Sequence, residues 1–223
     1  MCLNQEEKQR TAMYYAILLA LLAFFTWSFT EIVEVLQADK VKVFDLAVIH
    51  EVQSWISEGR TSRMVFITDL GSVGWMTAGT ILVAAILFVK KRWSYALFFV
   101  LTVSLGGAFN GFLKDVFKRQ RPEILRLIEQ GGYSFPSGHS MGSFIFYGAI
   151  AFLLFELLRH RWAKIIGTVV AFCLILLIGL TRIYLGVHYP SDVIGGFTAG
   201  AAWLIFCVAA FHYYQDRIHR QKE

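Results

Sequence analysis

Three short stretches of the sequence hold residue types that can bind and transfer a phosphoryl group. The first contains Lys114 and Arg121, the second is the string Pro-Ser-Gly-His at 136–139, and the third extends from 181 to 192. Cations bind phosphate oxygens, an imidazole exchanges protons near neutral pH, and a carboxylate can orient that imidazole. All three stretches lie at the ends of apolar segments, where ionisable groups are costly unless they are used. The pattern predicts a phosphate-handling site at a membrane surface.

Lys114 and Arg121 are seven positions apart, which is almost two helical turns. A continuous helix would place both on one face, roughly 10 Å apart. Pro122 disfavours a helical conformation of the residue before it, so we expect the helix to end at Arg121. Two cations would then lie at and just inside a helix end, although the doublet alone also fits a solvated basic cap. Three neighbouring basic residues are expected to be solvated: Lys118, Arg119 and Arg126.

The string at 136–139 directly precedes a long apolar run and is typical of a helix start. Ser137 is a natural N-cap, and Gly138 has no side chain to obstruct a close approach. Helix N-termini attract anions, and His139 in the first turn can protonate a leaving oxygen. Because Ser-Gly turns are common, this string alone is a weak signal.

The third stretch contains Arg182, His188 and Asp192 between the last two apolar runs. Pro190 fits the first turn of the final helix, which places Asp192 near His188. A carboxylate bonded to one imidazole nitrogen fixes the tautomer and leaves the other nitrogen as a nucleophile or base. This pair is the sharpest local signal in the chain.

The composition requires a membrane setting for these residues. Of the 223 residues, 57% are hydrophobic and only 17% are charged, and the mean hydropathy is +0.55. Soluble domains are far less apolar, so we expect an integral membrane protein. No Pro/Gly/Ser-rich linker or internal repeat divides the sequence, which predicts a single membrane-embedded domain over 1–223.

Six apolar runs are long enough to cross a bilayer as helices, which need ~20 residues each. They lie near 12–30, 70–89, 93–113, 139–158, 163–181 and 192–213. We therefore expect an all-α, polytopic fold. The first run lacks an Ala-x-Ala cleavage site and is expected to be an uncleaved signal anchor.

The turns at 90–92 and 159–164 are short and basic. By the positive-inside rule these turns and both termini are cytoplasmic. Six spans then place the third-to-fourth and fifth-to-sixth connections together on the extracytoplasmic side. The three stretches fall in or beside those two connections, so the topology predicts one shared site at the outer face of the plasma membrane.

Two further patterns concern helix packing. Apolar residues recur at helical spacing in the 31–69 loop: Phe44, Val48, Val52 and Trp55. They predict a short interfacial helix that covers the site, lies flat on lipid, or packs on the bundle without a gating role. Two glycine pairs are expected to let helices approach closely: Gly107 with Gly111, and Gly196 with Gly200.

The formal net charge of +5 fits the membrane better than nucleic acid, because many basic residues adjoin apolar runs. The three cysteines are not paired in loops, so no disulfide is expected. A zinc or di-metal site on His139, His188 and Asp192 would lack additional acidic ligands. We therefore expect a bilayer and a membrane lipid as partners, with no nucleic acid, metal or cofactor.

Taken together, the three stretches resemble the tripartite signature of the type 2 phosphatidic acid phosphatase superfamily, which also includes soluble vanadium haloperoxidases. The pattern is Lys-x6-Arg-Pro, Pro-Ser-Gly-His and Ser-Arg-x5-His-x3-Asp. Every position matches except Thr181, where the pattern usually has Ser, and this departure keeps a hydroxyl. The resemblance implies a helical bundle like that of these phosphatases and haloperoxidases.

The resemblance also implies residue roles. His188 would attack phosphorus to form a phosphohistidine, Asp192 would orient it, and His139 would protonate the leaving group and then activate water. The other residues of the signature would stabilise the phosphoryl oxygens: Lys114, Arg121, Ser137, Gly138 and Arg182. No metal takes part in this scheme.

Three functional hypotheses follow. The small size resembles bacterial phosphatidylglycerophosphatase B-type enzymes, so the leading one is a lipid phosphatase acting on phosphatidylglycerophosphate. The second is a polyprenyl diphosphate phosphatase, such as one acting on undecaprenyl diphosphate. The third belongs to another class, a transporter or lipid-binding protein that uses the cations only for recognition, and it gives no role to His139, His188 or Asp192.

Overall fold

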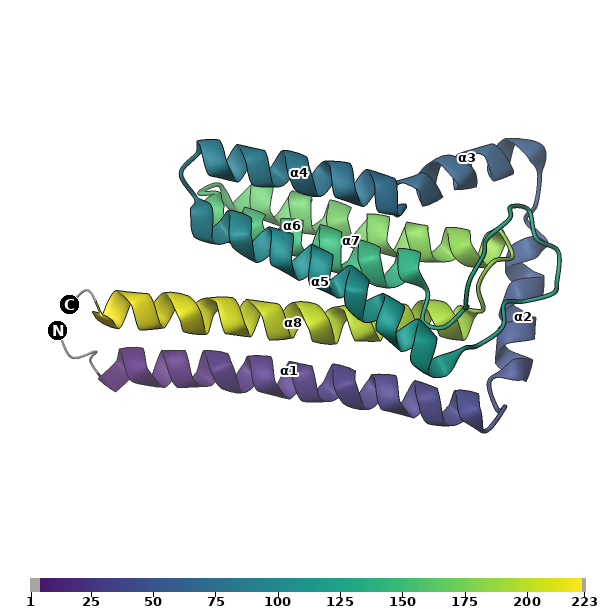
Figure 1. Ribbon diagram of the computed structural model, residues 1–223, viewed down its shortest axis with the longest axis horizontal. Helices are drawn as coiled ribbons and strands as arrows, with labels where there is room; N and C mark the ends of the chain where they lie inside the picture. Colours follow the sequence, from purple (N-terminus) through teal and green to yellow (C-terminus); the bar gives the residue numbers. More distant parts are fainter. Residues whose placement is uncertain (1–4, 222–223) are drawn as a thin grey trace.

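The computed structural model describes residues 5–221, and these form eight α-helices and no β-strand. Figure 1 shows the helices in chain order: α1 (Gln5–Gln37), α2 (Lys42–Gln53), α3 (Glu58–Asp69), α4 (Val73–Val89), α5 (Trp93–Phe117), α6 (Gly138–Leu157), α7 (Arg161–Tyr184) and α8 (Pro190–Gln221). The all-α fold class is confirmed.

Five helices are long and apolar enough to cross a membrane: α1, α5, α6, α7 and α8. A sixth span results if α3 and α4 are taken together, with a bend of 45° between them. The 17 residues of α4 extend only about 25 Å, slightly less than the ~30 Å hydrocarbon core. The six predicted spans therefore correspond to six segments of the fold.

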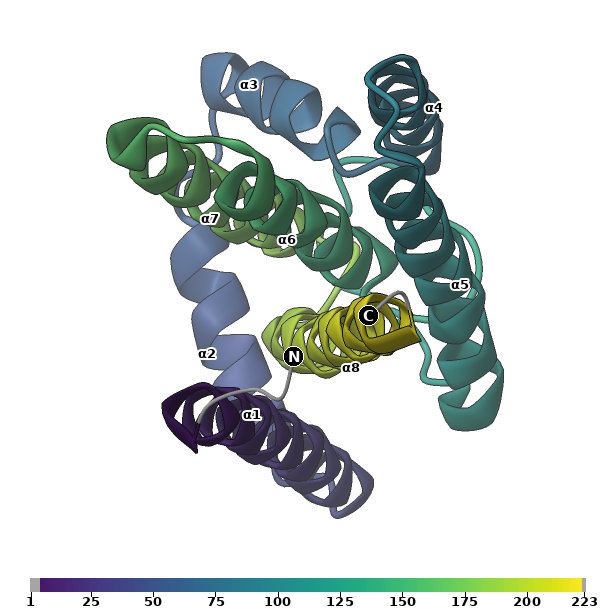
Figure 2. The same ribbon diagram turned by 90° about the vertical axis from the view of Figure 1, so that its left-hand side faces the viewer.

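The helix α6 lies at the centre of the bundle and packs against α5, α7 and α8. In the end-on view of Figure 2, α1 stands at the edge, where it packs against α8. Most of the α1 surface is exposed, as expected for a helix surrounded mainly by lipid. The amphipathic helix α2 lies across one end of the bundle (Figure 1).

A small apolar cluster holds α2 in place. Ile49 and Val52 of α2 pack against Tyr184, Leu185 and Val187, and all five side chains are buried. Residues 184–187 belong to the third stretch and connect the end of α7 to His188. The cluster therefore fixes the backbone just before His188, because buried apolar surface resists local opening.

The interfacial helix predicted within the 31–69 loop is present as α2, and its inward face carries a charged residue. Asp45, Ile49 and Val52 are buried, whereas Phe44 and Trp55 are exposed. The Asp45 carboxylate accepts hydrogen bonds from Ser191 inside the protein. These partners offset the cost of burying its charge.

One of the two predicted glycine contacts is confirmed. A Cβ atom at Gly196 would lie 2.8 Å from the carbonyl oxygen of Ser137, and one at Gly200 would lie 3.0 Å from that of Met141. These glycines let α8 approach α6. The other pair was predicted wrongly, because a Cβ atom at Gly107 or Gly111 would meet nothing within 4 Å. Neither glycine of that pair therefore mediates a close helix contact.

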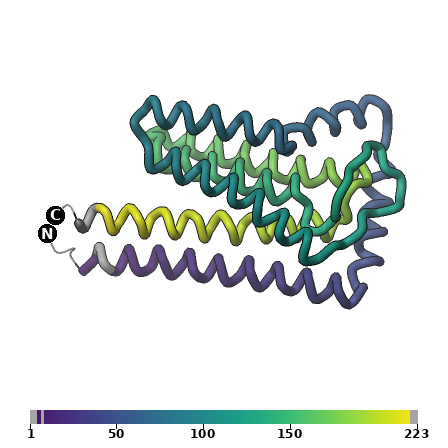
Figure 3. The backbone as a smooth tube through the Cα atoms, viewed as in Figure 1, coloured from purple at the N-terminus to yellow at the C-terminus, as the bar shows by residue number. Residues whose placement is uncertain are grey.

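The basic turns and the three stretches lie at opposite ends of the bundle. The turns α4–α5 and α6–α7 lie at the end where α1 begins and α8 finishes, and α2 lies at the opposite end (Figures 1 and 3). Segments 118–137 and 185–189 share that opposite end with α2. The predicted convergence of the three stretches on one side is confirmed.

The glycine contacts give a test of helix packing. We expect Gly196→Val to lower the free energy of unfolding by about 1–3 kcal/mol, because its side chain must displace the backbone at Ser137. Gly111→Val is the matched control, since it makes the same chemical change where no atom is close. Thermal unfolding of the detergent-solubilised protein checks both variants. Equal melting temperatures for the two variants would contradict the packing described for α6 and α8.

Candidate active site

A pocket of about 270 Å³ opens where the three stretches meet. Its polar wall contains Lys114, Arg121, His139 and His188. Its apolar wall continues along α4 and α5, with side chains that include Met76 and Val103, and with Gly106 and Gly107. The pocket therefore has a cationic end and an apolar wall.

The helix that carries Lys114 ends four residues earlier than predicted. α5 finishes at Phe117, and Lys118 adopts a left-handed conformation with φ +47°. The Lys118 amide donates to the Lys114 carbonyl, which closes the helix end and turns the chain. Arg121 consequently lies outside the helix, so the prediction of two cations on one helical face is wrong.

The two cations nevertheless converge. The Lys114 ammonium donates to the Tyr133 carbonyl at 2.6 Å, and Nη2 of Arg121 donates to the same oxygen at 3.2 Å. The segment around Tyr133 brings them together, in place of a shared helix. Two positive groups on one carbonyl leave a local excess of positive charge, which favours an anion in the pocket.

All five N–H groups of Arg121 have acceptors. Four donate to main-chain carbonyls, those of residues 131–133 and of Val187. The fifth points from Nη1 to Nε2 of His188 at 3.0 Å. Burial lowers the pKa of the Arg121 guanidinium below its usual value. Arg121 thus joins the 131–133 segment to the histidine.

His188 is buried, and its two ring nitrogens have different surroundings. Arginine has no acceptor atom, so Nε2 must accept from Arg121 and the proton must be on Nδ1. Nδ1 lies 3.4 Å from Oδ2 of Asp192 and 3.3 Å from the Ser134 hydroxyl. Burial lowers the pKa of His188 to about 4, although Asp192 opposes this shift. The imidazole is therefore neutral near pH 7, with the Nε2 lone pair toward the pocket.

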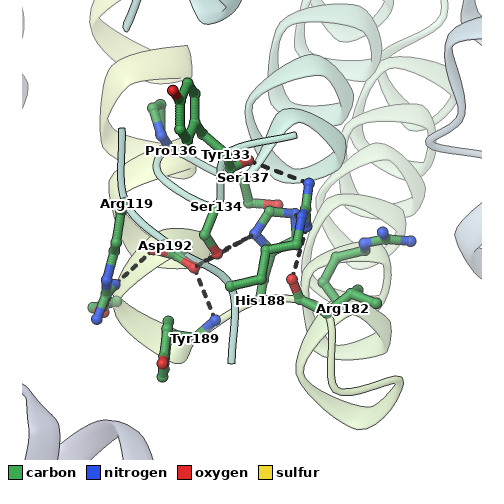
Figure 4. Close-up of polar contacts among 12 residues, drawn as sticks. Arg119, Tyr133, Ser134, Pro136, Ser137, Arg182, His188, Tyr189 and Asp192 are labelled. Atoms are coloured by element: carbon green, nitrogen blue, oxygen red, sulfur yellow. Dashed lines mark hydrogen bonds and ion pairs between the residues drawn. The ribbon is translucent and has the colours of Figure 1, made fainter. Parts of the chain in front are cut away.

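Asp192 is fully buried, and protein donors reach both its oxygens. Oδ2 accepts from the Ser134 hydroxyl and, at 2.9 Å, from the Tyr189 amide. Oδ1 accepts from Nη1 of Arg119 at 2.6 Å. Figure 4 shows Arg119 and His188 approaching the carboxylate from opposite sides.

The prediction that Arg119 is solvated is wrong. Its guanidinium bridges Asp192 and Asp45 and stacks over the Tyr189 ring at 4.1 Å. Burial alone would lower the pKa of Arg119, but the two carboxylates raise it above its usual value. Its neighbours Lys118 and Arg126 are exposed, as predicted.

Sequence reasoning also missed Asp45 and Ser134. Ser134 lies two residues before the recognised string, so its proximity was the only available signal. Asp45 was hidden among the apolar residues of the interfacial helix, 74 positions from Arg119. An aspartate on an otherwise apolar helix face indicates a buried side chain, but it does not indicate that Arg119 is its partner.

The string at 136–139 forms the start of α6, as predicted. The Ser137 hydroxyl caps the helix and accepts from the Ser140 amide at 3.4 Å. A Cβ atom at Gly138 would lie 3.1 Å from Oδ1 of Asn110, so only glycine fits this approach comfortably. Gly138 and His139 line the pocket, and the His139 ring makes no hydrogen bond to any residue in the described range 5–221. His139 is thus free to contact a ligand.

Arg182 stands just behind the pocket wall and is almost completely buried. Nη1 donates to the Thr68 hydroxyl at 2.7 Å, and Nη2 donates to Oε1 of Gln130, which lines the pocket. The arrangement places a third positive charge behind Gln130. No group of three His, Cys, Asp or Glu side chains suited to a metal ion occurs within the described part of the chain.

Comparisons with known proteins agree with this geometry. The model of the PAP2 superfamily matches residues 95–216. Phosphatidylglycerophosphatase B of Bacillus subtilis is 34% identical, over 71% of this chain and 76% of that protein. An undecaprenyl-diphosphatase of Sulfolobus acidocaldarius is 30% identical, over 56% of this chain and 59% of that protein.

A solved structure gives the same result in three dimensions. The crystal structure of a transmembrane PAP2-type phosphatidylglycerolphosphate phosphatase from Bacillus subtilis superposes with a TM-score of 0.80 at 27% identity. The similarity covers 88% of this chain and 96% of that one. The matched family, the membrane helices and the site at one end of the bundle lead to one assignment. The chain belongs to the PAP2 superfamily and is a multi-pass membrane phosphatase.

Proposed function

We propose that this phosphatase removes the terminal phosphate of phosphatidylglycerophosphate through a phosphohistidine intermediate. The supporting observation is a neutral, buried His188 whose Nε2 faces a cationic pocket with an apolar extension. The substrate is inferred from the relatives named phosphatidylglycerophosphatase B and phosphatidylglycerolphosphate phosphatase. Named phosphatases among the relatives favour an enzyme over the alternative of a non-catalytic transporter or lipid-binding protein.

In the proposed first step, Nε2 of His188 attacks phosphorus and the bond to the lipid oxygen breaks. Arg121 must first turn its Nη1 proton from Nε2 to a phosphate oxygen, because a lone pair engaged in a hydrogen bond cannot attack. His139 gives a proton to the departing lipid oxygen. Asp192 holds Nδ1 and stabilises the positive charge that the ring acquires when Nε2 binds phosphorus.

In the proposed second step, water attacks the phosphohistidine and gives its proton to His139. Phosphate leaves, and His188 returns to its neutral form. Lys114, Arg121 and the Gly138 amide contact the phosphoryl oxygens directly in this scheme. Arg182 acts through Gln130, and Ser137 acts by holding the start of α6 in position. No metal ion is required, because the cations supply the charge stabilisation.

A polyprenyl diphosphate such as undecaprenyl diphosphate is the second candidate substrate. It is favoured by the relatives from Sulfolobus acidocaldarius and Escherichia coli, whose names include undecaprenyl-diphosphatase. The pocket chemistry recognises a terminal phosphate in either lipid, so the same two steps would apply.

We also propose that the site opens at the extracytoplasmic face of the plasma membrane, with both termini cytoplasmic. The basic turns at 90–92 and 159–164 support this orientation through the positive-inside rule. They lie at the end of the bundle opposite the pocket. The lipid head group would then enter from the outer leaflet.

The substrate proposal is tested by phosphate release from detergent-solubilised protein in EDTA. We expect turnover without added metal and a higher kcat/KM for phosphatidylglycerophosphate than for undecaprenyl diphosphate. His188→Ala protein provides the blank. The reverse order would favour the second candidate, and activity that returns only with a divalent ion would contradict the metal-free mechanism.

The same assay tests the residue roles. His188→Ala is expected to abolish turnover, because no other nucleophile faces the phosphate position in the proposal. Asp192→Asn should retain partial activity through an imidazole that is poorly oriented and has lost its negative neighbour. His50→Ala, at an exposed histidine of α2, is the matched control and should behave as wild type. Wild-type turnover by His188→Ala would refute the assignment.

Sidedness is tested by labelling single cysteines in a cysteine-free background. Glu129→Cys lies in the exposed segment beside the pocket, and His160→Cys lies in the opposite basic turn without changing its Lys and Arg content. In cells without an outer-membrane barrier, an impermeant maleimide should label position 129 directly. Position 160 should react only after permeabilisation. The opposite pattern would place the site in the cytoplasm.

A further inference from the structure

Arg119 lies between two buried carboxylates that come from different parts of the chain. Nη1 donates to Oδ1 of Asp192 at 2.6 Å, and Nη2 donates to Oδ2 of Asp45 at 2.9 Å. Both carboxylates are 0% exposed. One planar guanidinium can satisfy two acceptors in fixed directions, which a lysine ammonium does less well.

Asp45 is itself fixed in place by the start of α8. Its Oδ1 accepts from the Ser191 amide at 2.9 Å, and its Oδ2 accepts from the Ser191 hydroxyl at 2.6 Å. Nη1 of Arg119 also donates to that hydroxyl, at 2.7 Å. Asp45 therefore ties α2 to the residue next to Asp192. It lies outside residues 95–216, the part that the family model matches.

We infer that Arg119 and Asp45 form a clamp that positions the Asp192 carboxylate toward His188, so that α2 contributes to catalysis without touching the substrate. The inference rests on the proposed role of His188 and Asp192. Neither Arg119 nor Asp45 lines the pocket, so both are positioning residues.

Arg119 can position the Asp192 carboxylate because the two oxygens of that carboxylate have different donors. Arg119 occupies Oδ1, which leaves Oδ2 for Ser134, the Tyr189 amide and Nδ1 of His188. Without Arg119, the carboxylate would be held through Oδ2 alone, and its orientation toward the imidazole would be less fixed. A displacement of about 1 Å at such a position can reduce a rate on the order of 10²-fold.

The clamp also controls how much negative charge His188 experiences. Arg119 offsets part of the Asp192 charge, and Asp45 in turn offsets part of the Arg119 charge. The other titratable or charged groups that influence His188 are Arg121, Arg182 and His139, and the clamp substitutions change none of them. The two halves of the clamp therefore have opposite electrostatic effects on the histidine.

Arg119→Gln leaves Asp192 more negative, which raises the pKa of His188 and protonates the nucleophile at higher pH. Asp45→Asn leaves Arg119 more positive beside Asp192, which lowers the pKa of His188. As the pH falls, the ratio of variant to wild-type kcat/KM should fall for Arg119→Gln and rise for Asp45→Asn. The ratio cancels the ionisation of the substrate, which is common to all the proteins.

The experiment measures kcat, KM and the pH dependence of kcat/KM for phosphatidylglycerophosphate hydrolysis from pH 4 to 9. We expect Arg119→Gln to lose on the order of 10²-fold in kcat with little change in KM, because the altered group does not contact substrate. Asp45→Asn should lose less, and Arg119→Lys should keep the wild-type pH dependence with a partial loss of kcat. The matched control Lys118→Gln removes an exposed cation next to Arg119 and should behave as wild type.

Two outcomes would overturn the inference: wild-type kcat in both Arg119→Gln and Asp45→Asn, or pH ratios that change in the same direction for both. If Arg119→Gln does not fold, the nearly isosteric Asp45→Asn and the Arg119→Lys variant still decide between the outcomes. His188→Ala separates this inference from the proposed function. An active His188→Ala protein refutes the proposed function. If His188→Ala is inactive while Arg119→Gln and Asp45→Asn have wild-type kinetics, only the clamp is refuted.

Discussion

The buried carboxylate of Asp192 is the group on which the arrangement of the site depends. Removing a carboxylate from water costs several kcal/mol unless donors surround it. Here the donors come from Arg119, Ser134, the Tyr189 amide and His188. Arg119 and Ser134 lie near the two ends of the α5–α6 connection, and His188 and Tyr189 lie in the connection between α7 and α8. Satisfying one charge therefore holds these two connections together at one end of the bundle.

In contrast to Asp192, whose negative charge has a cationic partner, the pocket contains positive side chains without carboxylate partners among the described residues. Lys114 and Arg121 donate to main-chain carbonyls, and Arg182 stands behind Gln130, so their charges are solvated by the protein but not neutralised by carboxylates. In the proposed mechanism, a phosphate dianion supplies the missing negative charge. Its oxygens can replace the carbonyls and the His188 nitrogen as acceptors for Arg121. In the proposal, phosphate binding therefore also frees the Nε2 lone pair of His188 from its hydrogen bond with Arg121. The reaction can then begin with attack by Nε2.

The sequence predicted the parts of the structure that depend on local chemistry. The six spans, the Ser137 cap and the proximity of His188 to Asp192 across Pro190 follow from hydropathy and short spacings. The failures involve contacts distant in sequence or unusual backbone. A left-handed Lys118 has no compositional signal, because lysine does not favour that conformation. The burial of Arg119 depends on Asp45, and the pair Gly107 and Gly111 shows that small residues at helical spacing also occur on open faces.

The central claim is that Nε2 of His188 carries the phosphoryl group, and it is tested most directly by trapping that group on His139→Ala protein. An aryl phosphate substrate has a leaving group that needs no protonation, so the first step can proceed without His139, while hydrolysis of the intermediate slows. The account predicts that an alkaline quench followed by mass spectrometry places an acid-labile phosphate on His188. Phosphate on any other residue, or turnover of this variant without a phosphoenzyme, would contradict it.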